Sequence, residues 1–176
     1  MKDSSRKRLL LLLLGLLLVA LDQITKILVK TNMCVGDSIP VIGDFLRICY
    51  VENVGMAFGF AWGGVVGKIA LSVFRIGLFA FLVWWISSLV KKGAPTGVLV
   101  GLSVIAAGAL GNIIDCWFYG LIFDEAPFLM GKVVDMISFS IFPPVFNDAD
   151  SCVTCGAAYL VLFQWKFFAK NDEKKV

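Results

Sequence analysis

The sequence predicts an α-helical polytopic membrane protein with four transmembrane helices, forming one domain over residues 1–176. Hydrophobic residues make up 59% of the chain, and the mean hydropathy is +0.88. A soluble domain is roughly 45–50% apolar, so the excess is expected to face lipid. Four apolar runs, separated by polar segments, are each long enough to cross a hydrocarbon core about 30 Å thick.

The first span is predicted over residues 9–29. A short basic start precedes an almost unbroken run of leucine, and the helical pattern continues through Asp22 and Lys26. A basic start before an apolar run also resembles a signal peptide, but no small-x-small cleavage site follows. At about 1.5 Å per residue the segment is about 30 Å long, which is enough to cross the bilayer.

Residues 30–64 form the first predicted outer segment. Glycine, proline, aspartate and β-branched residues are mixed here. Val41-Ile42 and residues 45–51 have the composition of short strands, broken at Gly43-Asp44. We therefore predict a small β-rich platform outside the bilayer core.

The second span is predicted over residues 65–90 and ends at Lys91-Lys92. Lys68 and Arg75 lie in its first half. We interpret both as interfacial anchors, because long basic side chains can extend their charged ends to the membrane surface.

The third span is predicted over residues 96–114 and the fourth over residues 152–169. The third carries no charge, and its small residues favour close helix contacts. Between these spans, residues 115–151 form a second outer segment, part of which is expected to lie flat on the membrane as an amphipathic piece.

Basic residues set the expected orientation. The N-terminus, the Lys91-Lys92 loop and the C-terminal tail are all basic. The positive-inside rule therefore places both termini in the cytoplasm, an N-in/C-in arrangement, and the two outer segments outside.

The composition excludes several kinds of chemistry. The chain has no histidine, which rules out Ser-His-Asp and Cys-His catalysis and HExxH zinc sites. Cys152 and Cys155 have CxxC spacing, but they open an apolar helix without a second ligand pair, so we favour helix packing over metal or redox work. We expect no metal, no cofactor and no nucleic-acid partner.

Polar residues from the first and third spans and from the two outer segments are expected to gather near the outer membrane level. They are Asp22, Lys26, Asn53, Asn112, Asp115, Asp135, Asn147 and Asp150. Ionisable groups at a bilayer are energetically costly, so they suggest a functional site by default.

Each of these residues also has a purely structural explanation. Asp22 and Lys26 are spaced i, i+4 and can pair on one helix face. Asn112 and Asp115 can form a C-terminal cap and a solvated turn. Asp150 with Ser151 makes a good N-cap for the fourth span. The convergence of so many polar groups on one rim favours a site.

Asp135 and Asp150 are the candidate catalytic pair. Two nearby carboxylates cannot both ionise cheaply, so they share one proton. One then acts as a base on water and the other as an acid toward the scissile carbonyl, which is the chemistry of an aspartic peptidase. We expect Asp150 to be the more acidic, because a helix N-terminus favours its anion, and Asp135 to begin protonated.

Five motifs, in order, resemble those of lipoprotein signal peptidase, the type II signal peptidase of bacteria. They are Asp22-Gln-Ile-Thr-Lys26, Asn53-Val-Gly55-Met-Ala57-Phe58-Gly59, Gly108-Ala-Leu-Gly111-Asn112-Ile-Ile-Asp115, Val133-Val-Asp135-Met-Ile137 and Phe146-Asn147-Asp-Ala149-Asp150-Ser151. The resemblance implies an aspartic endopeptidase that cleaves prolipoproteins before the diacylglyceryl-modified cysteine, with Asp135 and Asp150 as catalytic residues. It implies substrate contacts at Asp22, Lys26, Asn53, Gly55, Asn112, Asp115, Asn147 and Ala149.

The resemblance also implies a setting for the protein. It suggests four helices with an extracytoplasmic β-cradle in the bacterial cytoplasmic membrane, and an active site at the outer face. Diacylglyceryl-modified prolipoproteins and membrane lipid would be its partners, and globomycin-type cyclic peptides its inhibitors. We expect a monomer.

The chain departs from the family pattern in two places. Cys116 stands where the family commonly has arginine, and we expect Lys132 or Arg47 to supply the missing cation. The extra residues 118–130 are aromatic and acidic, and we predict that they form a lid or a lipid-facing flap.

Three other functions would need different sequence features. A channel or transporter predicts charges near the midplane and paired repeats, and the sequence has neither. A noncatalytic scaffold predicts that Asp135→Asn and Asp150→Asn are tolerated. A Ser-Lys peptidase lacks supporting spacing for its candidate residues, which are Ser138, Ser140 or Ser151 with Lys132.

Overall fold

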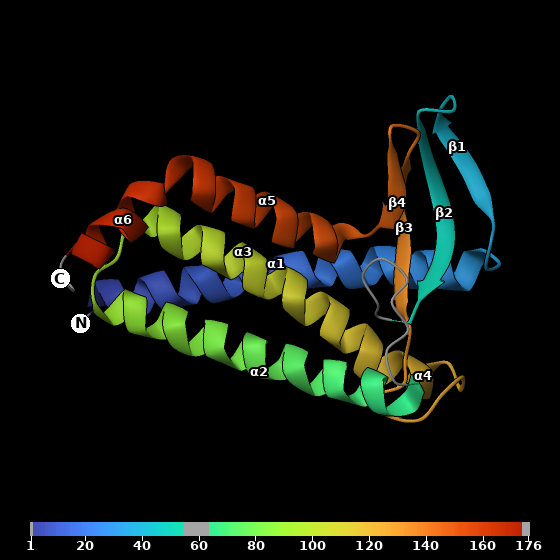
Figure 1. The fold of residues 1–176 in the computed structure, drawn as a ribbon, viewed down its shortest axis with the longest axis horizontal. Helices are drawn as coiled ribbons and strands as arrows, with labels where there is room; N and C mark the ends of the chain where they lie inside the picture. The colour runs from blue at the N-terminus through green and yellow to red at the C-terminus, as the bar shows by residue number, and fades with distance from the viewer. Residues whose placement is uncertain (1, 55–63, 174–176) are drawn as a thin grey trace.

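Long helices and a four-stranded sheet make up residues 2–54 and 64–173, which this computed structural model describes. Figure 1 shows the long helices side by side, with the sheet near one end and both chain termini at the other. The elements in order are α1 (Lys2–Asn32), β1 (Ser38–Ile42), β2 (Leu46–Asn53), α2 (Gly64–Lys91), α3 (Thr96–Ile114), the π-helical turn η2 (Asp115–Tyr119), α4 (Gly120–Ile122), β3 (Val133–Phe139), β4 (Phe142–Phe146), α5 (Asp148–Phe163) and α6 (Trp165–Glu173).

Three of the described helical stretches are long and apolar enough to cross a membrane. They are Ser5–Asn32, Gly64–Lys91 and Thr96–Ile122. Their positions confirm an apolar helix at each of the first three predicted spans. Side chains on α1 such as Leu9 and Leu17 are 55% and 57% exposed, which is the pattern of a helix that faces lipid.

The helix expected over residues 152–169 is divided in two. α5 starts earlier, at Asp148, and ends at Phe163. Gln164 leaves the helical conformation, with φ −119° and ψ 6°, and its side chain donates to the Tyr159 hydroxyl at 3.2 Å. The break turns α6 so that Phe167 and Phe168 pack on the apolar cluster around α3.

The third span does not end at Asp115, because helical structure continues through η2 and α4. The structural alternative for Asn112 and Asp115, a C-terminal cap and a solvated turn, is therefore excluded, and Asp115 is 0% exposed. The loop after α4 packs on this turn: the Gly131 N–H donates to the Cys116 carbonyl at 2.9 Å. A Cβ on Gly131 would lie 2.1 Å from the Asp115 carbonyl oxygen, so only glycine fits there.

The sheet has the antiparallel order β1-β2-β3-β4. β1 and β2 confirm the predicted β-rich platform. β3 and β4 were not predicted, and they occupy part of the segment in which a flat amphipathic piece was expected. Pro143 and Pro144 argue against a strand, but β4 is an edge strand, where proline is tolerated.

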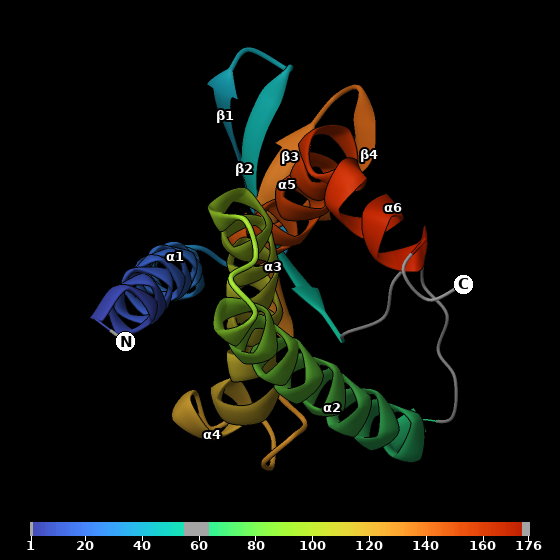
Figure 2. The same cartoon turned by 90° about the vertical axis from the view of Figure 1, so that its left-hand side faces the viewer.

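α3 is the central helix, and Figure 2 shows it between α1, α2 and α5. Glycines allow this close packing. A Cβ on Gly108 would lie 2.3 Å from the Ala149 carbonyl oxygen, and one on Gly111 would lie 2.4 Å from Asp22 Oδ2. A second apolar cluster under the sheet, with Val134 and Met136 at 0% and 3% exposure, joins β3 to α1 and η2.

Candidate active site

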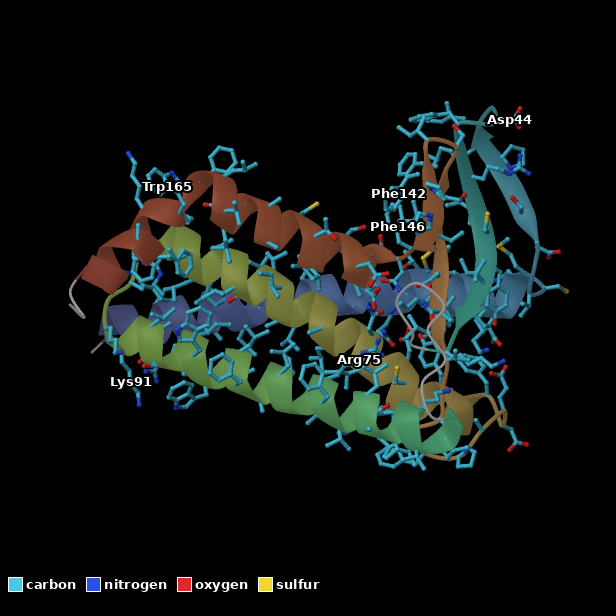
Figure 3. The ribbon with its side chains drawn as sticks, in the orientation of Figure 1. Asp44, Arg75, Lys91, Phe142, Phe146 and Trp165 are labelled. Carbon is cyan, nitrogen blue, oxygen red and sulfur yellow. The ribbon has the colours of Figure 1, made fainter. Side chains whose placement is uncertain are left out.

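Two different elements bring Asp135 and Asp150 to one polar centre. Asp135 lies in β3 and is 3% exposed, whereas Asp150 lies in the first turn of α5 and is half-buried. The buried Asn147 connects them: its Nδ2 donates to Asp135 Oδ1 at 2.6 Å, and its Oδ1 accepts from the Asp150 N–H at 2.9 Å. Figure 3 shows oxygen-bearing side chains gathered where α5 meets the sheet.

Asn147 is the N-cap of α5, which corrects the expectation that Asp150 and Ser151 cap this helix. Its backbone is extended, with φ −128° and ψ −179°, because it directly follows β4. Asp150 is therefore inside the helix, in the first turn, where the helix dipole favours a negative charge.

Asn112 of α3 links the candidate pair to a buried charge. Its Nδ2 donates to Asp150 Oδ1 at 2.8 Å. Its Oδ1 accepts from Lys26 Nζ at 2.9 Å and from Asn147 Nδ2 at 3.1 Å. These acceptor contacts fix the orientation of the Asn112 amide, so that its NH2 group faces Asp150.

Lys26 lies between two carboxylates and is 0% exposed. Its Nζ is 2.9 Å from Asp22 Oδ2 and 2.8 Å from Asp115 Oδ2. The i, i+4 pair with Asp22 therefore forms, but within a buried cluster rather than on a solvated face. Asp22 Oδ1 also accepts the Ala149 N–H at 2.9 Å, which ties α1 to the first turn of α5.

Asn53 at the end of β2 donates from Nδ2 to Asp135 Oδ2 at 3.1 Å. Of the ten predicted site residues, nine therefore contribute to one connected network, and Ala149 does so through its backbone. Gly55 lies outside the described residues.

Two further members of the network, Gln23 and Tyr119, were not among the predicted site residues, although Gln23 lies within the first motif. Gln23 Nε2 donates to Asp115 Oδ1 at 3.0 Å, and the Tyr119 hydroxyl donates to Gln23 Oε1 at 3.1 Å. Asp148, next to the predicted Asn147, accepts from the Thr25 hydroxyl at 2.5 Å. Each of these contacts joins residues from distant parts of the chain.

The electrostatic environment favours a proton on Asp135. Burial raises the pKa of Asp135 to about 6, and the nearby Asp150 carboxylate acts in the same direction. The amide donors Asn53 and Asn147 oppose this shift, because they stabilise the anion.

The cation at Cys116 is Arg75, not Lys132 or Arg47. Arg75 Nη1 donates to the Cys116 sulfur at 3.1 Å, whereas Lys132 pairs with Glu52 and Arg47 with Asp44. Arg75 of α2 therefore contacts η2, which corrects its interpretation as an interfacial anchor.

Lys68, the other expected anchor, also bonds to protein: its Nζ donates to the Met130 carbonyl at 2.6 Å. At the opposite side of the extra segment 118–130, Lys30 Nζ lies 2.8 Å from Glu125 Oε1 and 2.8 Å from Glu52 Oε1. Burial alone would raise the pKa of Glu52, but bonds from Lys132 and Lys30 lower it to about 2. Ionic contacts thus hold this segment against α1 and β2.

Within residues 2–54 and 64–173, no group of three or more Cys, Asp or Glu side chains is arranged to hold a metal ion. The network presents two carboxyl groups, Asp135 and Asp150, each bonded to an amide donor and close enough to influence each other electrostatically. This arrangement suits acid–base hydrolysis.

Comparisons with known proteins identify the family of this chain. A family model described as signal peptidase (SPase) II matches residues 14–166. The chain is 38% identical to a lipoprotein signal peptidase of Porphyromonas gingivalis, over 83% of this chain and 78% of that protein. It is 36% identical to one of Halothermothrix orenii, over 86% and 92% of the two chains. A solved bacterial membrane enzyme superposes with a TM-score of 0.68 at 32% identity, covering 91% of this chain and 90% of the other.

Proposed function

This chain belongs to the signal peptidase II family of membrane proteases, and from that premise we propose that it removes prolipoprotein signal peptides with an Asp135–Asp150 dyad. We propose that cleavage occurs just before the diacylglyceryl-modified cysteine. The observation that carries the assignment is the buried Asn147 amide, which bonds to the Asp135 carboxyl group and to the Asp150 backbone.

Asp135 begins protonated and Asp150 ionised. Burial and a neighbouring carboxylate favour the neutral form of Asp135, and the N-terminus of α5 favours the anion of Asp150. Asp150 takes a proton from water as the water oxygen bonds to the carbonyl carbon. Asp135 donates its proton to the carbonyl oxygen, which gives a neutral tetrahedral diol. When the C–N bond breaks, Asp150 returns its proton to the leaving amine and Asp135 recovers one from the diol.

The buried cluster around Lys26 positions this dyad. Lys26 orients the Asn112 amide, and Asn112 in turn donates to Asp150. Asp22 holds the first turn of α5 through the Ala149 N–H. Because Lys26 is 0% exposed, we assign it a positioning role.

Half-buried amides are the better candidates for substrate contact. Asn53 and Asn112 are partly accessible beside the dyad. An amide can bond to an unwound substrate backbone, which lipid cannot do. Gly55 stays a predicted contact. We expect globomycin-type cyclic peptides to compete for the same groups.

We propose four membrane spans with both termini in the cytoplasm and the dyad at the outer face of the bacterial cytoplasmic membrane. Three stretches have the required length and apolarity. α5 has 16 residues, about 24 Å at 1.5 Å per residue, and would be the fourth span. Both termini lie at the end of the bundle away from the sheet (Figure 1), which agrees with an even number of spans. We propose that the chain acts as a monomer and as one domain.

The test is cleavage of a diacylglyceryl-modified prolipoprotein by the reconstituted full chain, with the released signal peptide identified by mass. Asp135→Asn and Asp150→Asn are each expected to lower kcat by about 10²–10⁴-fold, since each removes a proton-transfer group. Asp44→Asn is the control, because Asp44 is 99% exposed in the β1–β2 turn. Full activity in either dyad variant would exclude the dyad. Globomycin is expected to inhibit the unmutated chain and Asp44→Asn equally.

A further inference from the structure

Three phenylalanine rings share the face of the sheet from which Asp135 projects. Side chains alternate along a strand, which places Asp135 and Phe139 of β3 on one face. In the antiparallel pairing with β4, Phe146 is opposite Ile137 and Phe142 is opposite Phe139, and the register shifts between these two pairs. Directly opposed residues project to the same side. We call Phe139, Phe142 and Phe146 the aromatic ledge.

The rings of the aromatic ledge form one apolar surface. The ring centroids of Phe139 and Phe146 are 6.0 Å apart, and those of Phe142 and Phe146 are 5.9 Å apart. Phe142 is 50% exposed, and the other two rings are half-buried. An exposed apolar surface of this kind indicates an interaction site.

β4 is poorly suited to pairing with a further strand. It is the edge strand of the sheet and contains Pro143 and Pro144, which have no N–H to donate. A peptide added at this edge would find few hydrogen-bond partners. The aromatic ledge is therefore better suited to an apolar ligand that needs no hydrogen bonds.

The aromatic ledge is continuous with the candidate dyad. Phe146 directly precedes Asn147, whose amide bonds to Asp135. Figure 3 shows the side chains of Phe142 and Phe146 on the side of β4 nearer the helix bundle. Lipid surrounds that bundle in the proposed topology, so an alkyl chain can pass from the bilayer to the ledge without crossing water.

We propose that the aromatic ledge binds an acyl chain of the diacylglyceryl group on the substrate cysteine. This inference rests on the proposed function, and it names the residues that recognise the lipid part of that substrate. The rings offer apolar contact to methylene groups, so affinity should grow with the length of chain that covers them. The aromatic ledge is joined to Asp135 through Phe146 and Asn147. This closeness to the candidate dyad favours the substrate's own acyl chain, rather than bulk lipid, as the ligand.

The first test compares two synthetic prolipoprotein peptides, whose cysteine carries either dipalmitoylglycerol or dioctanoylglycerol, with the full chain in one detergent. Phe142→Ala is expected to raise KM for the dipalmitoyl peptide about tenfold, equal to about 1.4 kcal/mol. KM for the dioctanoyl peptide and kcat for both peptides should stay within about twofold. Phe142→Trp should keep the wild-type KM, because it keeps an aromatic surface.

Phe163→Ala is the matched control, since Phe163 is 69% exposed at the opposite end of α5. It should change neither KM. An equal rise of KM for both peptides in Phe142→Ala would mean that the ring contacts lipid in general, and this would overturn the proposal. An unchanged KM for the dipalmitoyl peptide would overturn it as well.

A second measurement does not depend on turnover. Dipalmitoylglyceryl-cysteine, which has no scissile bond, should raise the Tm of the unmutated chain and of Phe163→Ala, and should raise that of Phe142→Ala less. Equal shifts in all three would overturn the aromatic ledge as the binding surface. Normal shifts without cleavage of either peptide would instead count against the proposed function alone.

Discussion

Asp135 is 3% exposed, and its described hydrogen-bond partners are two neutral amides, Asn53 and Asn147. Neutral donors stabilise an anion less than a cation would. Burial therefore dominates and raises the pKa of Asp135 to about 6. A carboxyl group that keeps its proton in mildly acidic solution is suited to act as the acid of a dyad.

This property predicts a pH dependence. As pH rises through about 6, Asp135 loses the proton that the proposed reaction requires, so kcat/KM should fall up to about tenfold per pH unit. Asn53→Ala removes a donor that stabilises the Asp135 anion, so the pKa of Asp135 should rise. The pH at which kcat/KM begins to fall should therefore move to a higher value. Steady-state kinetics across pH measure both effects, and the apparent pKa values obtained belong to Asp135 and Asp150 as a pair. A move of this pH to a lower value in Asn53→Ala would contradict this account of Asp135.

Lys26 supports a second prediction at the residue scale. Its amine is the shared partner of the buried Asp22 and Asp115. Lys26→Met leaves both carboxylates without a cation, and the free energy of unfolding should fall by about 3–5 kcal/mol. Thermal or denaturant unfolding in detergent measures the loss. Arg47→Gln is the control: its partner Asp44 is 99% exposed, so stability should barely change. Equal stability of Lys26→Met and the unmutated chain would show that the cluster is not structurally important.

At the scale of elements, the close approach of α1, α3 and α5 assembles the network. Gly111 and Gly108 of α3 face Asp22 and the Ala149 carbonyl, so a side chain at either position would push a neighbouring helix away. The same contacts hold the first turn of α5, and with it Asp150, beside α3. Helix packing and dyad geometry are therefore coupled.

Gly111→Ala tests this coupling. The added Cβ would lie 2.4 Å from Asp22 Oδ2, and such overpacking costs about 1–3 kcal/mol. We expect lower stability together with lower kcat, because Asp22 holds the Ala149 N–H. Gly77→Ala on α2 is the matched control: its Cβ would have nothing within 4 Å, and alanine favours helix, so stability should be kept or rise. A fully active and stable Gly111→Ala would refute the coupling.

The whole molecule separates an apolar bundle from a polar and aromatic end. Figure 1 places both termini at one end of the bundle and the sheet near the other. In the proposed topology this arrangement would bring water and the substrate cleavage point to the same level. It also leaves the apolar flanks of α1 and α2 to lipid.

The proposed topology makes a prediction at this scale. Fluorescent reporters that mature only in the cytoplasm should be active when fused at either terminus. A tag inserted beside Asp44, in the β1–β2 turn, should be accessible to an impermeant reagent added to cells whose outer barrier has been opened. Termini that report on opposite sides of the membrane would rule out four spans with N-in/C-in orientation.

The sequence by itself determined the apolar spans, the basic ends and the order of the polar motifs, because hydropathy and periodicity are properties of contiguous residues. It also indicated β1 and β2 through their composition and turn. It did not indicate the division between α5 and α6, because the break at Gln164 depends on the packing of Phe167 and Phe168 against α3.

Only the tertiary structure decided which residues are hydrogen-bonded to one another in the site. Asp22 meets the Ala149 N–H across 127 positions, and Lys26 meets Asn112 across 86. β3 became recognisable as a strand by pairing with β2, and that pairing set the face from which Asp135 and the aromatic ledge project. Hydrogen-bond geometry between distant segments depends on how helices and strands pack, which local residue patterns do not encode. The motif residues and the candidate pair Asp135 and Asp150 could therefore be chosen from the sequence, whereas the positioning cluster and the aromatic ledge required the fold.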